Sequence, residues 1–437
     1  MPAIGKILVI FFSALLLTRM RVPLGIALVV GGVSLNLWAG LGIPGTSWNL
    51  LMSLADPELW IMLAVMAFII EIGRFLTEES NAKEIIGAVE QWGGRHGRSA
   101  TLMGMPAVIG LIPMPAGALL SAPFVQKAGG EGTELNDWKA SVNYWFRHVW
   151  EYWWPLYPGV IVAMSLFEME RWRFISGQCF FSVVAIGFGY FVLVRSHVGR
   201  LAAATGSSGR PGGHRALFLM LPIAIVVASL FTLPPLLREV LPRLHPQLAQ
   251  LPLKLTELLG MLAGLLVALV VILVDELQRG RIGIFGSLLK KTSLSIMFSL
   301  FGVLVFKYML ESSKLLPVAS GELMKSGIPV SFAVAGLPLL AGLVTGVAFG
   351  FTGTSFPLVV GMMKAEGSGL TPLSTLALAY GFGYIGMMLS PVHLCLLVTR
   401  DYFSSTIKTI LVRTLPCMLA ILAWAIIAHL IFGRFGL

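Results

Sequence analysis

Ionisable residues are concentrated in one unexpected place, the stretch FRHVWEYWWPLYPG at residues 146–159. It holds Arg147, Glu151 four residues later, and the helix breakers Pro155 and Pro158, all inside an apolar run. Residues four apart share one face of a helix, so this arginine and glutamate can pair. Ionisable side chains within membrane segments are costly and by default mark a functional site. For Arg147 the alternative is that its side chain snorkels to the cytoplasmic end of the helix. For Glu151 two roles stay open, a proton carrier and one partner of a structural ion pair.

A second broken helix is predicted around Pro391, in the sequence GMMLSPVHLCL. A proline removes a backbone donor and leaves a carbonyl free to bind a cation. The residues predicted to hold a coupling ion are therefore Asn143, Arg147, Glu151, Pro155, Pro158 and Pro391. The polar residues predicted to touch a substrate here are Tyr157, Ser390 and His393. For His393 the alternative is a hydrogen-bonded core histidine, and for the tryptophans at 150, 153 and 154 it is an interfacial belt.

Two further apolar stretches, about 98–127 and 335–363, are interrupted in their middle by Gly, Pro and small polar residues. Each half is too short to cross a bilayer, so both stretches are predicted to be re-entrant hairpins, buried in protein or lining a wet cavity. Their tips are expected at residues 115–117 and 352–355. Helix N-termini and hydroxyls there suit an anion, whereas the alternative is that small residues only permit close helix packing. The residues predicted to bind substrate at these tips are Gly117, Ser121, Thr352, Gly353, Thr354 and Ser355.

The whole chain has the composition of a membrane protein, with 57% hydrophobic and 12% charged residues among 437. Ten full spans fit the apolar runs, near 5–18, 23–41, 58–77, 141–166, 174–195, 216–236, 255–275, 293–311, 372–398 and 410–432. The net charge of +10 comes from basic residues in short loops, which indicates control of topology rather than nucleic-acid binding. Three isolated cysteines, without paired spacing, predict neither disulfides nor a metal site.

The loop charges also predict an orientation. With both termini outside, 20 of the 31 Lys and Arg residues lie on the cytoplasmic side. The apolar run at 7–17 is preceded by one lysine and followed by two arginines, the reverse of a cleavable signal, so it is predicted to be the first span. The polar segment 205–215 is predicted to be a cytoplasmic linker.

The two halves of the chain resemble each other at a spacing of about 234 residues. Ser121 and Pro123 recur as Ser355 and Pro357, and Pro158 recurs as Pro391 at a spacing of 233. Each half, 1–204 and 216–437, then holds five spans and one hairpin. Because five is odd, the second half enters the membrane inverted, an arrangement typical of secondary transporters.

The hairpins IPMPAGALLSAP and GFTGTSFPL and the broken helix FGYIGMMLSPVHLCLLVTRDYF resemble, over essentially the whole chain, an uncharacterised ten-span family of the ion transporter superfamily. Its relatives include dicarboxylate, citrate and gluconate transporters. The resemblance implies a scaffold domain that forms a homodimer and a transport domain that moves like an elevator. The Ser-Asn-Thr signatures of the relatives are missing from both tips, so the resemblance does not carry over dicarboxylate specificity or sodium coupling.

These observations predict an all-α polytopic protein of the cell (inner) membrane that acts as a secondary active transporter. Its substrate is expected to be a small organic anion, a carboxylate or sugar acid, moved by symport with protons or Na+. No cofactor is expected beyond Na+ as a possible coupling ion. The alternatives are a channel, which needs a continuous polar pore, and an intramembrane enzyme, for which the sequence has no HExxH or GxSxG motif.

Overall fold

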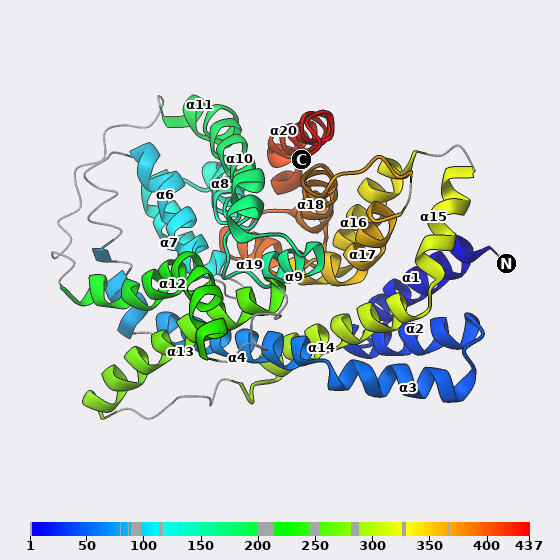
Figure 1. Ribbon diagram of the computed structural model, residues 1–437. Coiled ribbons are helices and arrows are strands. Elements are labelled where there is room, and N and C mark those ends of the chain that lie inside the picture. The colour runs from blue at the N-terminus through cyan, green and yellow to red at the C-terminus, as the bar shows by residue number, and fades with distance from the viewer. Residues whose placement is uncertain are drawn as a thin grey trace.

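Proline and glycine divide the apolar sequence into many helices, arranged in two layers in the computed structural model (Figure 1). The structure describes residues 2–437 except 79, 86, 89–97, 113–116, 131, 199–213, 245–252, 281–287, 326–328 and 366. Within this part the regular elements are all helical.

The lower layer of Figure 1 contains the first helices of each half of the chain. Neighbouring helices in it pack α1 on α2, α2 on α14, α4 on α13 and α12 on α13. Their bounds are α1 (Ala3–Arg19), α2 (Leu24–Trp38), α3 (Gly42–Ala55), α4 (Pro57–Thr77), α12 (His214–Leu244), α13 (Leu253–Gln278) and α14 (Lys291–Ser312).

The upper layer contains the two helical hairpins, α6 with α7 and α16 with α17, and the helices that pack around them. From the first half it takes α6 (Arg98–Gly110), α7 (Ala118–Gly129), a 3-10 turn (Thr133–Leu135), α8 (Asn136–Phe146), α9 (Pro158–Phe167), α10 (Arg171–Gly189), a π turn (Tyr190–Val194) and α11 (Arg195–Val198). From the second half it takes α16 (Val330–Thr345), α17 (Ala348–Met363), α18 (Pro372–Leu389), α19 (Leu394–Phe403) and α20 (Ile407–Arg434). α15 (Leu315–Lys325) lies against α1 and α17.

Seven described segments are long and apolar enough to cross a membrane, so the chain is a multi-pass membrane protein. They are α4, α10 with its π turn, α12, α13, α14, α18 with α19, and α20. Three of the ten predicted spans differ from this set. α1 and α2 have 17 and 15 residues, and the predicted span 141–166 is divided into α8 and α9.

Two helices were not expected from the sequence, α3 and α15. Pro44 and Pro317 each occupy the third position of their helix. The first-turn N–H groups have no partner within a helix, so a proline there costs no hydrogen bond.

Both predicted breaks are present in the upper layer. α8 ends at Phe146 and α9 begins at Pro158, with only turns between them, while Ser390 to His393 separates α18 from α19. Both α9 and α19 then end at a left-handed residue, Glu168 with φ 51° and Ser404 with φ 52°.

Candidate functional site

A cavity of about 460 Å³ lies between the two layers. α4 and the start of α14 form its lower wall, and the two breaks and the tip of the second hairpin form its upper wall. The lining residues are Met66, Ile69, Ile70, Gly73, Arg74, Thr77, His148, Glu151, Tyr157, Pro158, Gly159, Lys290, Ser293, Ile296, Gly346, Val347, Ala348, Phe349, Met387, His393, Leu394 and Cys395. This volume lies within the range of small-molecule sites.

Arg147 in the first break holds the end of α6. Its guanidinium donates to the carbonyls of Gly110 (3.4 Å) and Ile112 (3.2 Å) and to the hydroxyl of Tyr157 (2.7 Å). A cation is favourable at the C-terminus of a helix, where carbonyls lack partners. Glu151 Oε1 lies 3.8 Å from Arg147 Nη1, so the ion pair expected from the spacing is present but long. Arg147 is 1% exposed, and therefore does not snorkel to water in this structure.

The indole N–H groups of the three tryptophans in the first break all bond to neighbouring parts of the protein. The indole of Trp150 donates to the carbonyl of Ala107 (2.8 Å) and that of Trp154 to the carbonyl of Leu111 (2.9 Å). Trp153 donates to the hydroxyl of Ser182 (2.8 Å). The first break is therefore hydrogen-bonded to α6, to the turn after it and to α10.

Side chains of the second break likewise form hydrogen bonds with the end of α16. Ser390 donates to the carbonyl of Leu343 (2.7 Å), and His393 Nδ1 lies 2.7 Å from the carbonyl of Gly346. His393 is therefore a hydrogen-bonded histidine that also lines the cavity. Its contact with a substrate stays a prediction. Pro391 is exposed and does not line the cavity.

Several carbonyls at the breaks accept hydrogen bonds from tyrosines. Tyr380 donates to the carbonyl of Glu151 (2.7 Å) and Tyr384 to that of His148 (2.9 Å). Tyr144 donates to the carbonyl of Met388 (2.8 Å). The carbonyl of Glu151, which Pro155 leaves without its helical donor, therefore already has one partner. A role of the break carbonyls in binding an ion stays a prediction. All three bonds join opposite halves of the chain, so their cause is tertiary.

The tip of the second hairpin lies at Gly346 and Val347, not at residues 352–355 as expected. Gly346 ends α16 with φ 66°, a conformation that glycine adopts without strain. Thr352, Thr354 and Ser355 lie inside α17, and their hydroxyls bond to carbonyls four residues earlier in the same helix. Gly353 is also in α17, where its Cα faces Val303 of α14. A role of these residues in substrate binding stays a prediction.

In the first hairpin, Gly117 directly precedes α7, while Pro115 and Ala116 lie outside the described residues. Ser121 donates to Asn143 Oδ1 at 2.6 Å, and Asn143 in turn donates to the carbonyl of Ala118 at 2.9 Å. These groups are buried and away from the cavity. Their partners are protein atoms, and their predicted roles in binding stay predictions.

Four of the predicted site residues line the cavity: Glu151, Tyr157, Pro158 and His393. Pro155 is buried beside them without lining it. Sequence reasoning missed Arg74, His148, Lys290 and Cys395, which also line it. His148 lies within the stretch at residues 146–159, so its place at the first break could have been predicted from the sequence. Cys395 also stands in a predicted broken helix, two residues after His393. Arg74 and Lys290 come from α4 and the start of α14, whose approach to the breaks depends on tertiary packing.

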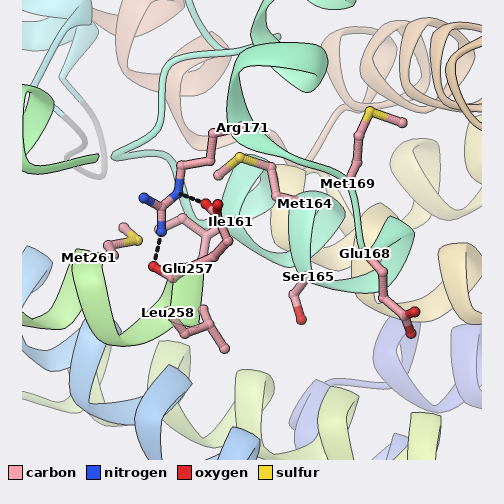
Figure 2. Close-up of a pocket in the computed structure, with 9 residues that line it drawn as sticks. All are labelled: Ile161, Met164, Ser165, Glu168, Met169, Arg171, Glu257, Leu258 and Met261. Atoms are coloured by element: carbon pink, nitrogen blue, oxygen red, sulfur yellow. Dashed lines mark hydrogen bonds and ion pairs between the residues drawn. The ribbon is translucent and has the colours of Figure 1, made fainter. Parts of the chain in front are cut away.

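A second pocket, drawn in Figure 2, lies where the turn between α9 and α10 meets α13, and its volume is only about 30 Å³. Arg171 forms an ion pair there with Glu257 (3.3 Å), which also pairs with Arg238 (2.8 Å). This space suits one or two water molecules rather than an organic solute. The pocket is therefore a joint between the layers and not a substrate site.

The fold resembles a solved transporter structure. The crystal structure of the Alcanivorax borkumensis YdaH transporter, described as having an unusual topology, aligns with a TM-score of 0.59 and 15% sequence identity. The alignment covers 90% of this chain and 89% of that one, and at this identity it speaks for the fold alone. A search of curated proteins finds no match. Residues 4–432 match the family described as "Protein of unknown function (DUF401)", and the chain therefore belongs to that family.

Proposed function

We propose that the protein is a secondary active transporter that moves a small organic anion, a carboxylate or sugar acid, together with protons or Na+. The observation that carries the proposal is the cavity of about 460 Å³ between the layers, walled by two broken helices and a hairpin tip. Interrupted helices that meet at an internal site are typical of secondary transporters. The likeness to a transporter fold agrees with this function.

An internal duplication, with halves 1–204 and 216–437 joined by the linker 205–215, is supported by helix positions. Asn136, Pro158 and Arg171 begin α8, α9 and α10, and α18, α19 and α20 begin 236 residues later in each case. The hydrogen bonds follow the same spacing, because Tyr157 binds the carbonyl of Gly110 and His393 binds that of Gly346.

The two layers correspond to the parts that an elevator needs. The hairpins and broken helices lie together in the upper layer, and α1–α4 with α12–α14 form the lower one. In the proposal the lower layer is the scaffold, through which two chains form a homodimer. The upper layer carries the substrate past it, with both termini outside the cell.

An anionic substrate is supported by the charges around the cavity. Lys290 lies exposed on its wall, and Arg74 reaches it while bonded to Glu276 (2.8 Å). The second hairpin tip adds the N-terminus of α17, where backbone N–H groups favour negative charge. Among the described residues that line the cavity, Glu151 has the one carboxylate, and it is proposed to take part in coupling.

Counterflow in proteoliposomes tests the proposal. Vesicles containing the purified protein and a saturating unlabelled anion should take up a radiolabelled trace of that anion and then release it. The anion is chosen from carboxylates and sugar acids that raise the melting temperature of the protein, with and without Na+. A channel predicts a different result, a linear loss of the gradient without transient accumulation, and would overturn the transporter assignment.

A further inference from the structure

Two histidines and a cysteine meet on the wall of the cavity. His148 comes from the first break, His393 from the second, and Cys395 from the first turn of α19. Their ligand atoms all lie within 4.8 Å of one another. The three side chains are 0%, 6% and 8% exposed, yet all of them border the cavity.

The carbonyl partners of Nδ1 fix the tautomers of both histidines. His148 Nδ1 lies 2.6 Å from the carbonyl of Tyr144, and His393 Nδ1 lies 2.7 Å from the carbonyl of Gly346. A carbonyl oxygen only accepts hydrogen bonds, so each Nδ1 must carry its proton. In neutral rings both Nε2 atoms are then bare lone pairs.

Those two Nε2 atoms face each other at 3.0 Å. Two lone pairs at this separation repel, so the pair requires a cation between them. A single proton would satisfy the two nitrogens and leave the Cys395 thiol as a weak hydrogen-bonding partner of His148. A metal ion uses all three groups.

We propose that His148 Nε2, His393 Nε2 and Cys395 Sγ bind one transition metal ion of the Zn²⁺ class. Zn²⁺ takes imidazole at about 2.0–2.1 Å and thiolate at about 2.3 Å, which separates two tetrahedral nitrogens by roughly 3.4 Å. The two nitrogens lie 3.0 Å apart in the structure and must separate by roughly 0.4 Å to hold the ion. Carbonyl partners on Nδ1 are the usual outer support of metal-binding histidines, and both are in place.

The donor set also selects the class of ion. Imidazole and thiolate suit Zn²⁺ and its neighbours, whereas Na+, Mg²⁺ and Ca²⁺ prefer oxygen ligands. Binding converts the Cys395 thiol to a thiolate, and the released proton leaves through the cavity. Three protein ligands leave a fourth position of a tetrahedral ion for water or for the carboxylate of Glu151, whose Oε1 lies 4.0 Å from His148 Nε2.

Cobalt binding by the purified full-length protein in detergent tests the site without any transport assay, so it stands or falls separately from the proposed function. Protein stripped with a chelator should bind one Co²⁺ per chain and develop a near-ultraviolet thiolate-to-cobalt charge-transfer band. Zn²⁺ should displace the Co²⁺ and remove the band, while Mg²⁺ should not.

Matched variants assign the ligands. Cys395→Ser should lose the charge-transfer band, whereas Cys417→Ser, at another buried free cysteine, should keep it. His393→Gln and His148→Gln should weaken binding by more than the ~10–100-fold seen for loss of an outer partner. His429→Gln, a histidine that contacts Ser374 far from the cavity, should leave binding unchanged.

If the variants fail to fold, the wild-type protein still decides the question. Zn²⁺ should protect Cys395 from a small alkylating reagent, read by mass spectrometry, and leave Cys179 equally reactive. Absence of stoichiometric Co²⁺ binding, a band that persists in Cys395→Ser, or unchanged alkylation of Cys395 each overturns the proposal. In the first case the histidine pair holds a proton instead.

Discussion

Replacing Gly353 with Ala adds one methyl group where α17 of the upper layer meets α14 of the lower layer. A Cβ atom at this position would lie 2.2 Å from Cγ2 and 3.1 Å from Cγ1 of Val303. Ordinary contacts begin at 3.4 Å, so the helices must separate by about 1.2 Å or Val303 must leave its rotamer. Overpacking of this kind costs about 1–3 kcal/mol.

The assay is the free energy of unfolding in mixed micelles, measured by tryptophan fluorescence. Gly336→Ala is the matched control, because Gly336 lies inside α16 and a Cβ there meets nothing within 4 Å. This control should raise stability by roughly 0.5–1 kcal/mol, since alanine favours a helix more than glycine. Gly353→Ala should lower it.

The partner substitution identifies the cause. Val303→Ala alone removes buried methyl groups and should destabilise by about 1–3 kcal/mol. Combined with Gly353→Ala it removes both γ carbons that cause the clash, so the double variant should be more stable than the sum of the single effects by at least about 1 kcal/mol. Equal stability of Gly353→Ala and wild type, or strictly additive effects, would refute the packing argument.

The same geometry changes the expectation for Gly353→Val. As a predicted tip residue, Gly353 should not tolerate valine, and Gly353→Val should abolish transport by filling space that a ligand needs. In the structure the added side chain instead meets Val303 of α14, so the expected loss of transport has a packing cause. Counterflow measured with Gly353→Val and with the Val303→Ala double variant separates the two causes, because only a packing effect is rescued.

Three more predictions concern the cavity and the orientation. If the Glu151 carboxylate carries a proton, Glu151→Gln should abolish gradient-driven accumulation but keep substrate exchange. A lowered melting temperature with both transport activities reduced would instead indicate a structural ion pair. Wild-type transport and a wild-type melting temperature would remove Glu151 from the site. Arg147→Met should lower the free energy of unfolding by about 3–5 kcal/mol, because it leaves Glu151 buried without its ion pair and the end of α6 without its donors. Arg147→Lys should lower it less, and equal effects of the two substitutions would contradict the capping role. A cysteine placed at position 210 should resist an impermeant thiol reagent on intact cells, and labelling there would reverse the predicted orientation.

The largest features of the fold could be predicted from local sequence, because each depends on local properties. Apolar runs of sufficient length make membrane helices wherever they lie, and Pro158 and Pro391 stand at the two breaks. Proline alone does not specify a break, because Pro106, Pro123, Pro338 and Pro357 lie inside helices. The helices α3 and α15 were not predicted, because their 14 and 11 residues fall below the length that a membrane span needs.

The position of a hairpin tip is harder to predict, since the tip depends on where two helix arms stop. Thr352 to Ser355 is the more polar segment, yet the chain turns at Gly346, where φ 66° is needed and the carbonyl meets His393. The hydroxyls of Thr352 and Thr354 donate hydrogen bonds to carbonyls of their own helix, so these polar residues do not indicate a turn.

By itself, the sequence determined that this chain enters the membrane many times, breaks two helices and places scarce charges beside one of the breaks. Only the tertiary structure decided what those charges and carbonyls face. Arg147 caps α6, tyrosines of the other half occupy carbonyls that the breaks release, and His148 meets His393 at 3.0 Å across 245 positions of sequence. The reason is physical: a helix break is set by residues next to one another, whereas a site is set by which helices pack together, and residue spacing alone does not specify that packing.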